Sequence, residues 1–227
     1  MNHGDILRRL DELIQTRSIL NHPFYRAWQS GALSREQLAV YAKSYYPHVA
    51  AFPDYLRSAI AKTTDAVVRT ELEKNLSDEL TNPAPHPELW LDFAEGLGRN
   101  RESVSSAAPT PATKRAVDAF HRLSAGGTAG ALAALYAYES QQPGVSTTKM
   151  DGLRKFYDIH DSDTLAYFEV HAEKDIEHSA GERAAMLRFC DAGASAELIL
   201  NAANKALDAY WGLLDGICAE TGIETSC

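Results

Sequence analysis

Two histidines and an aspartate in one short segment constrain the fold of this chain most strongly. They are His171, Asp175 and His178, with the spacing H-x3-D-x2-H. On an α-helix, Asp175 lies about 40° and His178 about 20° from His171 around the axis, so the three share a face only if the segment is helical. Imidazole and carboxylate ligands together favour iron, manganese or zinc. Because Tyr167 extends the same stripe by one turn, we favour a metal site over the alternative of an exposed polar face.

The rest of the chain also has helical periodicity, because apolar residues recur at three- and four-residue intervals without strand-like alternation. Helices are expected over residues 5–18, 65–80, 87–97, 128–142, 147–159, 162–190 and 195–220, with others starting at a Ser34–Gln37 capping box and at Thr110-Pro111. Helix ends are expected at Asn82-Pro83-Ala84-Pro85, Gly98, Gly126-Gly127 and Pro143-Gly144, and a surface loop over 103–108. We therefore expect one all-α bundle of about eight to ten helices, as a single domain over residues 1–227.

Length and charge limit the classes of function. The 227 residues are 45% hydrophobic and 23% charged, which is typical of a globular protein with a substantial core. A formal net charge of −9 disfavours binding to nucleic acid or to an anionic membrane surface. The chain has no long apolar run, and its amphipathic first residues do not resemble a signal peptide, so a cytoplasmic location is expected.

The cysteines predict no disulfide framework, because Cys190, Cys218 and Cys227 are odd in number and widely spaced. Buried thiols are expected at Cys190 and Cys218, and an exposed one at the terminal Cys227.

Further metal ligands are expected on other helices, since a dinuclear centre in a bundle draws ligands from several of them. Glu139 ends an apolar, alanine-rich helix, where a carboxylate is costly to bury unless it is paired or bound to metal. Glu79 and His86 form an E-x6-H pair in which Glu79 ends one helix and His86 enters the next. The alternatives are a solvent-facing Glu139 and an ordinary polar helix end beside a loop histidine.

Taken together, these residues describe a dinuclear centre. The six candidate ligands are Glu79, His86, Glu139, His171, Asp175 and His178. Three carboxylates and two divalent cations leave a net charge near +1 and open positions for water, oxygen or substrate. A structural zinc site is disfavoured, because no cysteine takes part and six ligands exceed one tetrahedral site. Glu173 and Glu177 fall on another face of the helix and are expected to face solvent.

In this order and separation, the six residues resemble the ligand series of the haem-oxygenase-like dinuclear-metal oxidases. The resemblance covers most of the chain, including HPELWLDFAEGLG after the first pair. Within that superfamily, the sequence looks most similar to the family of the chlamydial protein associating with death domains, whose bacterial members are self-sacrificing para-aminobenzoate synthases of folate biosynthesis. The resemblance implies a haem-oxygenase-like bundle, an Fe/Fe or Mn/Fe centre, molecular oxygen and an external reductant as co-substrates, and a homodimer.

Residues outside the ligand set match the same family. Tyr25, in NHPFYRAW, matches the tyrosine whose side chain becomes the aromatic ring of the product, and Lys149, in STTKMDGL, matches the internal amino donor. Tyr41, Tyr138 and Tyr167 match further tyrosines of that site. Without the resemblance, Tyr25 would be interpreted as part of a hydrophobic cluster with its aromatic neighbours, and Lys149 as a surface lysine.

Three alternative functions stay open at this point. A dinuclear-iron oxygenase or oxidase would act on a free amine, amino acid or fatty acid instead of Tyr25. A protein-interaction module would need no metal. A thiaminase-like or quinone-cofactor-synthase relative would share the fold but lack the metal ligands.

Overall fold

The helices begin and end mostly where the sequence supplies caps and helix-breaking residues. The computed structural model describes residues 3–191 and 193–224, and within these ranges it contains helices and no strands. The elements in chain order are α1 (His3–Thr16), the 3-10 helix η1 (Ile19–Asn21), α2 (Pro23–Gln29), α3 (Arg35–Lys62), α4 (Ala66–Thr81), α5 (His86–Gly96), α6 (Arg101–Ser105), α7 (Pro111–Ala125), α8 (Thr128–Glu139), α9 (Gln142–Tyr157), α10 (Ser162–Asp191) and α11 (Ala196–Thr221).

Two of the predicted helix starts are confirmed at the level of hydrogen bonds. Ser34 and Gln37 form a reciprocal capping box, in which the Gln37 amide donates to Ser34 Oγ at 3.1 Å and the Ser34 amide donates to Gln37 Oε1 at 2.8 Å. The Thr110 hydroxyl caps α7 by accepting from the amide of Thr113. These local signals fix where α3 and α7 begin.

Two predictions about helix boundaries and the predicted number of helices are wrong. Pro143-Gly144 does not end the alanine-rich helix, because α8 ends at Glu139 and Pro143 lies in the first turn of α9, where a missing backbone N–H costs nothing. Part of the expected loop at 103–108 belongs to α6, and the described residues contain eleven α-helices rather than eight to ten. The short helices α2 and α6 account for the difference. The C-terminal Cys227 lies outside the described residues.

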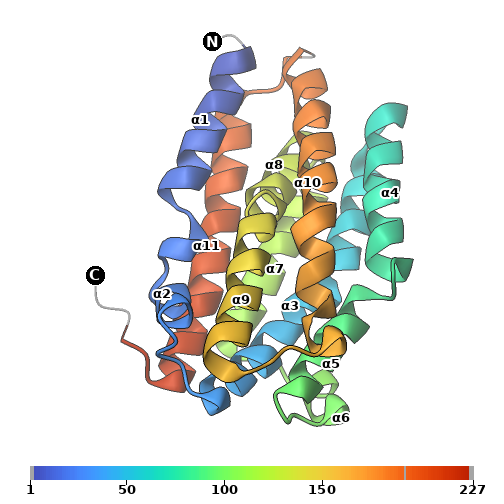
Figure 1. The fold of residues 1–227 in the computed structure, drawn as a ribbon. Helices are drawn as coiled ribbons and strands as arrows, with labels where there is room; N and C mark the ends of the chain where they lie inside the picture. Colours follow the sequence, from blue (N-terminus) through green and yellow to red (C-terminus); the bar gives the residue numbers. More distant parts are fainter. Residues whose placement is uncertain (1–2, 192, 225–227) are drawn as a thin grey trace.

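The long helix α10 occupies a central position in the bundle (Figure 1). It packs against α9, α5, α8 and α4, while α11 packs against α8 and α7 on the other side. Figure 1 also shows α1 running along α11 and α4 lying on the outer side of α10. Side chains from α4, α5 and α8 can therefore meet those of α10.

A close approach between α2 and α9 fixes the position of Lys149. Gly152 lies against Trp28, and a Cβ at Gly152 would come within 2.6 Å of Trp28 Cδ1. The indole N–H of Trp28 donates to the carbonyl of Lys149 at 3.2 Å. Glycine at position 152 thus lets the two helices touch, one turn away from a lysine that points inward.

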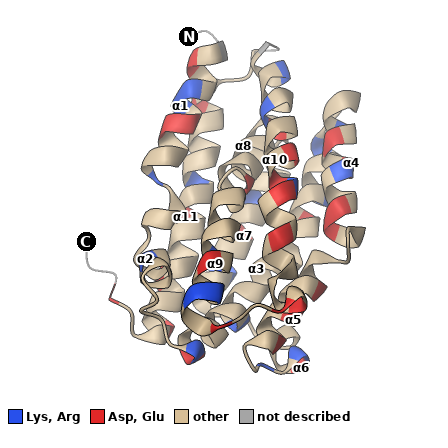
Figure 2. Cartoon of the chain, in the orientation of Figure 1, with Lys and Arg blue, Asp and Glu red and all other residues tan. Residues whose placement is uncertain are grey.

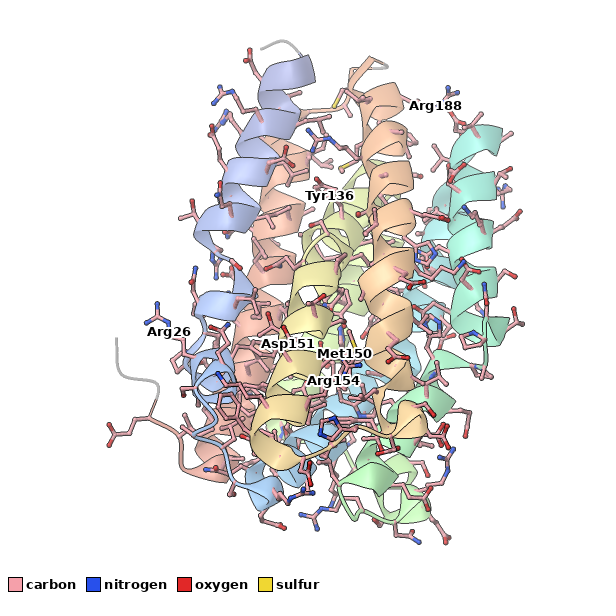
Figure 3. The ribbon with its side chains drawn as sticks, in the orientation of Figure 1. Arg26, Tyr136, Met150, Asp151, Arg154 and Arg188 are labelled. Atoms are coloured by element: carbon pink, nitrogen blue, oxygen red, sulfur yellow. The ribbon has the colours of Figure 1, made fainter. Side chains whose placement is uncertain are left out.

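The outer faces carry most of the charge. Acidic residues appear along α4 and α10 in Figure 2, and Glu173 and Glu177 are exposed, as expected. Figure 3 places Arg188 high on α10, on the side of α4, where its Nη2 lies 2.9 Å from Asp65 Oδ2. Cys190 and Cys218 are buried, which confirms that prediction. Within the described ranges, no helix combines the length and apolar character that crossing a lipid bilayer requires.

Candidate metal centre

The six candidate ligands gather in two groups, each built from more than one helix. The first group is Glu79, His86 and His171, and the second is Glu139, Asp175 and His178. All six side chains are buried, and the ligand atoms within each group lie within 4.8 Å of one another. Helix α10 contributes to both groups, α4 and α5 complete the first, and α8 completes the second. The structure thus brings together every residue that the sequence assigned to the centre.

The E-x6-H pair meets across a corner between two helices. Glu79 lies in the last turn of α4, and His86 is the first residue of α5. Pro83 and Pro85 prevent one continuous helix from forming between them. As a result, His86 Nδ1 lies 3.0 Å from Glu79 Oε1, as expected from the sequence.

Backbone carbonyls hold two of the histidines in one orientation. His171 Nδ1 lies 2.7 Å from the carbonyl oxygen of Tyr167, and His86 Nε2 lies 3.2 Å from that of Asn82. Because a carbonyl oxygen can only accept, each of these ring nitrogens carries the proton. The other ring nitrogens, His171 Nε2 and His86 Nδ1, point toward Glu79, where a bound cation would take the place of a proton. Metal-ligating histidines are commonly fixed in this way.

His178 is held between carboxylates. Its Nε2 lies 3.0 Å from Asp78 Oδ2, and its Nδ1 lies 3.3 Å from Asp175 Oδ1 and 3.7 Å from Glu139 Oε1. Burial disfavours the charged ring, but the hydrogen bond to Asp175 and the charges of Glu139 and Asp175 outweigh it and raise the pKa of His178 to about 9. A cation on the Nδ1 side would replace that proton, with Asp78 orienting the ring from behind.

The two groups differ in how their carboxylates ionise. Burial opposes ionisation of Glu79, but His86 and His171 overcome it and lower the pKa of Glu79 to about 2. Burial raises the pKa of Glu139, and the nearby charge of Asp175 adds to this effect. In the second group the charged form of Glu139 is therefore disfavoured, and a bound cation would stabilise it.

Several buried ligand atoms have no hydrogen-bond partner among the described residues. They are His86 Nδ1, Glu139 Oε2, Asp175 Oδ2 and both carboxylate oxygens of Glu182. Unpaired buried polar atoms are rare in folded proteins, because each costs free energy. Their concentration around these two groups fits bound metal ions.

Both groups line one small enclosed cavity. Its walls include Glu79 and His171 from the first group, Glu139 and Asp175 from the second, and Tyr138. The cavity measures about 10 Å³, which is close to the minimum volume for a single water molecule. A shared cavity places the two groups on opposite sides of one centre.

Glu182 is a further buried carboxylate that the sequence interpretation did not include. It lies on α10, is 3% exposed, and contacts the carboxylate of Glu139. Helical spacing could have revealed it, since Glu182 follows His178 by four residues and so returns to the same face.

Lys149 is buried among aromatic rings, and the interpretation of it as a surface lysine is wrong. Its side chain is 1% exposed, and burial lowers the pKa of Lys149 well below the ordinary lysine value. Its Nζ lies 5.1 to 5.7 Å from the centroids of five rings, those of Tyr25, Tyr41, Tyr45, Trp90 and Phe168. Sequence reasoning could not find this environment, because tertiary packing creates it.

Aromatic side chains connect Lys149 and the five rings around it, here called the lysine cluster, to the metal ligands. The ring of Tyr167 stacks on His171 at 4.0 Å and meets Trp90 edge-on at 4.7 Å. Trp90 lies 5.6 Å from the ring of Tyr41, whose hydroxyl is 3.3 Å from that of Tyr25. Each of these distances joins ring centroids, except the last, which joins oxygens. The series forms a continuous path of oxidisable rings.

Comparison with known proteins identifies the family. Residues 39–211 match the family described as iron-containing redox enzymes. The chain belongs to that family. It is 40% identical over 220 residues to the 4-aminobenzoate synthase of Nitrosomonas europaea, covering 92% of this chain and 89% of that protein. It is 36% identical to the 4-aminobenzoate synthase of Chlamydia trachomatis, covering 98% and 96% of the two chains.

A solved structure confirms the predicted fold of this iron-containing redox enzyme. A domain of unknown function from Shewanella denitrificans, with a haem-oxygenase-like fold, aligns with a TM-score of 0.79 at 16% sequence identity. The alignment covers 97% of this chain and 93% of the other. The bundle described above is therefore haem-oxygenase-like.

The donor set suits the metal that the family description names. Imidazole nitrogens and carboxylate oxygens without thiolate favour iron or manganese over a structural zinc site. The unpaired atoms on Glu139 and Asp175 lie where such an ion needs ligands. The chain is a dinuclear-metal redox enzyme.

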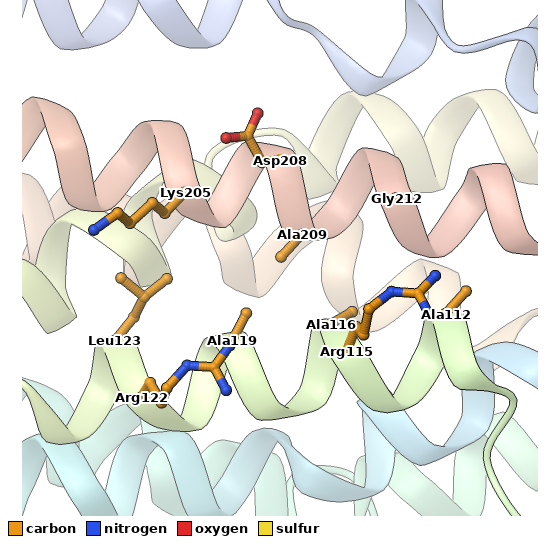
Figure 4. A pocket seen from close by; sticks show the side chains of 10 residues that line it. All are labelled: Ala112, Arg115, Ala116, Ala119, Arg122, Leu123, Lys205, Asp208, Ala209 and Gly212. Atoms are coloured by element: carbon orange, nitrogen blue, oxygen red, sulfur yellow. The ribbon is translucent and has the colours of Figure 1, made fainter.

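A groove with basic side chains lies apart from this centre. A groove of about 590 Å³ runs between α7 and α11, with Arg115 and Arg122 on one helix and Lys205 on the other (Figure 4). Small residues such as Ala116 and Gly212 form its floor. None of the six ligands lines it.

Proposed function

We propose that this chain is a self-sacrificing para-aminobenzoate synthase of folate biosynthesis. Tyr25 supplies the aromatic ring of the product and Lys149 supplies its nitrogen. A dinuclear Fe/Fe or Mn/Fe centre, molecular oxygen and an external reductant drive the reaction. The names and identities of the relatives support the reaction class, and the position of Lys149 supports the internal source of the product.

One observation carries the proposal: a buried lysine amine lies beside the ring of a buried tyrosine. Lys149 Nζ is 5.3 Å from the centroid of the Tyr25 ring. Burial lowers the pKa of Lys149 well below the ordinary lysine value and so favours the neutral amine, whose lone pair can attack carbon. A lysine kept only for packing would be costly at this depth.

The connectivity of tyrosine matches that of the proposed product. In tyrosine the phenolic oxygen is para to Cβ, and in para-aminobenzoate the amino nitrogen is para to the carboxyl carbon. The nitrogen of Lys149 replaces the phenolic oxygen of Tyr25, which leaves as water, and the Cε–Nζ bond of the lysine breaks to release the amine. Cleavage of Cα–Cβ, with oxidation of Cβ to the carboxyl group by dioxygen, completes that arrangement. No diffusible aromatic precursor is required.

The metal centre, when loaded, supplies oxidising power drawn from dioxygen. His171 would hold one ion of this centre and its ring stacks on Tyr167, so Tyr41, Trp90 and Tyr167 form a path of oxidisable rings from Tyr25 to the site. Burial raises the pKa of Tyr25 well above its usual value. The phenol therefore stays protonated until it is oxidised, and Tyr41 holds its hydroxyl in place.

The size of the cavity favours an internal substrate over a free one. The space between the metal groups is about 10 Å³, enough for a molecule the size of water. A free amine, amino acid or fatty acid would not fit between the ligands in this arrangement, whereas Tyr25 already lies within the core at 0% exposure.

The assembly belongs to the same proposal. A homodimer in the cytoplasm, with no nucleic-acid or membrane partner and with a reductant supplied by another molecule, is the form in which we expect the enzyme to act. Light scattering of the purified protein measures whether it is a homodimer.

Replacement of Tyr25 tests the proposal. Metal-loaded protein should form para-aminobenzoate with oxygen and reductant, and Tyr25→Phe should form none while binding the same amount of metal. Tyr46→Phe is the matched control, because Tyr46 lies on α3 and is partly exposed. Product formation by Tyr25→Phe at the normal yield would overturn the proposal in favour of a free substrate.

A further inference from the structure

Glu182 occupies the next position on the face of α10 that carries the metal ligands. It follows Asp175 by seven residues and His178 by four, which places the three side chains within about 60° of one another around the helix axis. The face thus continues as H-x3-D-x2-H-x3-E. Glu182 is 3% exposed, so its carboxylate points into the bundle.

The carboxylate of Glu182 lies against other carboxylates. It contacts that of Glu139, and the charge of Asp175 also acts on it. Apart from this contact with Glu139, neither of its oxygens has a hydrogen-bond partner among the described residues. Burying a charged group in this state is very costly unless a cation compensates it.

Asn75 shows which oxygen of Glu139 is left for a metal ion. The Asn75 amide donates to Glu139 Oε1 at 2.9 Å, which holds that oxygen in place. The other oxygen, Glu139 Oε2, is unpaired, as is Asp175 Oδ2. Glu182 thus contacts a carboxylate, that of Glu139, which still has an oxygen free to bind a metal ion.

We propose that Glu182 is an additional ligand of the metal ion bound by Glu139, Asp175 and His178. The proposal requires the dinuclear centre but not the fate of Tyr25. With Glu182 included, four carboxylates balance two divalent cations, so the buried centre is neutral rather than near +1. A neutral centre has the smaller cost of burial.

Close packing of α4 keeps Glu182 in this position. Gly181 lies against α4, and a Cβ there would come within 2.9 Å of the carboxylate oxygen Oε2 of Glu71. Glu182, His178 and Asn75 line a small pocket at this boundary. The helices thus leave Glu182 facing the second metal group.

A crystal structure of the metal-loaded protein tests the coordination directly. With manganese and iron located by anomalous scattering, a carboxylate oxygen of Glu182 should lie about 2.0–2.2 Å from one ion, the usual carboxylate–metal distance. A Glu182 more than about 3 Å from both ions, donating a hydrogen bond to Glu139, would overturn the proposal.

Metal counting provides a second test that involves no turnover. Anaerobic titration of Glu182→Gln with Fe²⁺ or Mn²⁺ should weaken one of the two sites by more than the roughly 10–100-fold that loss of a ligand's hydrogen-bond partner produces. Glu182→Asp should recover part of the affinity, and Glu173→Gln, exposed on the same helix, should bind two ions normally. Two ions bound to Glu182→Gln with unchanged affinity would contradict the proposal.

The result is independent of the proposed synthase activity. If Glu182 coordinates metal but Tyr25→Phe still forms product, the ligand assignment stands and the self-sacrificing reaction fails. If Tyr25→Phe is inactive while Glu182 lies away from both ions, only the ligand assignment fails.

Discussion

The metal groups and the lysine cluster bury ionisable side chains in opposite ways. Around α10, histidines and carboxylates face one another, and the pKa of Glu79 falls to about 2 while that of His178 rises to about 9. Around Lys149, the neighbours are aromatic rings, and burial alone lowers the pKa of the amine. One region stabilises charge for binding a metal, and the other suppresses charge to leave a nucleophile.

Replacing a metal-binding histidine should break the first region and give the largest effect. His178→Ala should lose one metal ion and all product formation, because it removes the only imidazole of the second group. Asp78→Asn keeps that imidazole and removes its partner, so metal binding should weaken by roughly 10–100-fold. Metal content after anaerobic loading measures both effects. Equal losses of bound metal in His178→Ala and Asp78→Asn would contradict the assignment of His178 as a metal ligand and of Asp78 as its hydrogen-bond partner.

Replacing Trp90 should break the connection between the two regions. Trp90 lies 4.7 Å from Tyr167 and 5.6 Å from Tyr41, so Trp90→Leu interrupts the aromatic path without touching a ligand. Product formation should slow by roughly tenfold or more, equivalent to about 1.4 kcal/mol in the barrier. Rapid quenching measures the rate, and Trp90→Phe is the conservative control. An unchanged rate in Trp90→Leu with normal metal content would exclude this path.

Replacing Lys149 should separate stability from chemistry in the second region. In the folded state burial lowers the pKa of Lys149, so folding works against the proton that the unfolded chain binds and this lysine costs stability at low and neutral pH. Lys149→Met should therefore abolish product and raise the melting temperature by roughly several degrees. The gain should shrink as the pH rises toward the ordinary lysine pKa. A lower melting temperature in Lys149→Met at neutral pH would contradict a neutral buried amine.

The smallest effect concerns His178 in metal-free protein. Its folded pKa of about 9 lies above the ordinary histidine value of 6.5, so the protonated ring adds stability that is complete below about pH 6.5 and is lost as the pH rises through 9. Chemical denaturation across this range should show a falling free energy of unfolding, and His178→Asn should remove that slope. A flat profile in the unsubstituted protein would argue against the surrounding carboxylates as the cause.

The sequence predicts those parts of the site that depend on helical spacing and local caps. The stripe from His171 to His178 and the corner between Glu79 and His86 follow from residue order, and the structure has both. Pro143 misled the boundary prediction because proline fits the first turn of a helix as well as the end of one. The burial of Lys149 depends on α2, α3 and α5, which no local pattern reveals.

Isotopic labelling of the protein measures the central claim most directly. Protein made with carbon-13 tyrosine and nitrogen-15 lysine, loaded with iron and manganese, is given oxygen, reductant and unlabelled tyrosine and lysine in solution. The account predicts para-aminobenzoate with a labelled ring and labelled nitrogen, at no more than one molecule per chain, with matching mass loss at Tyr25. Unlabelled product, or repeated turnover with an intact chain, would contradict it.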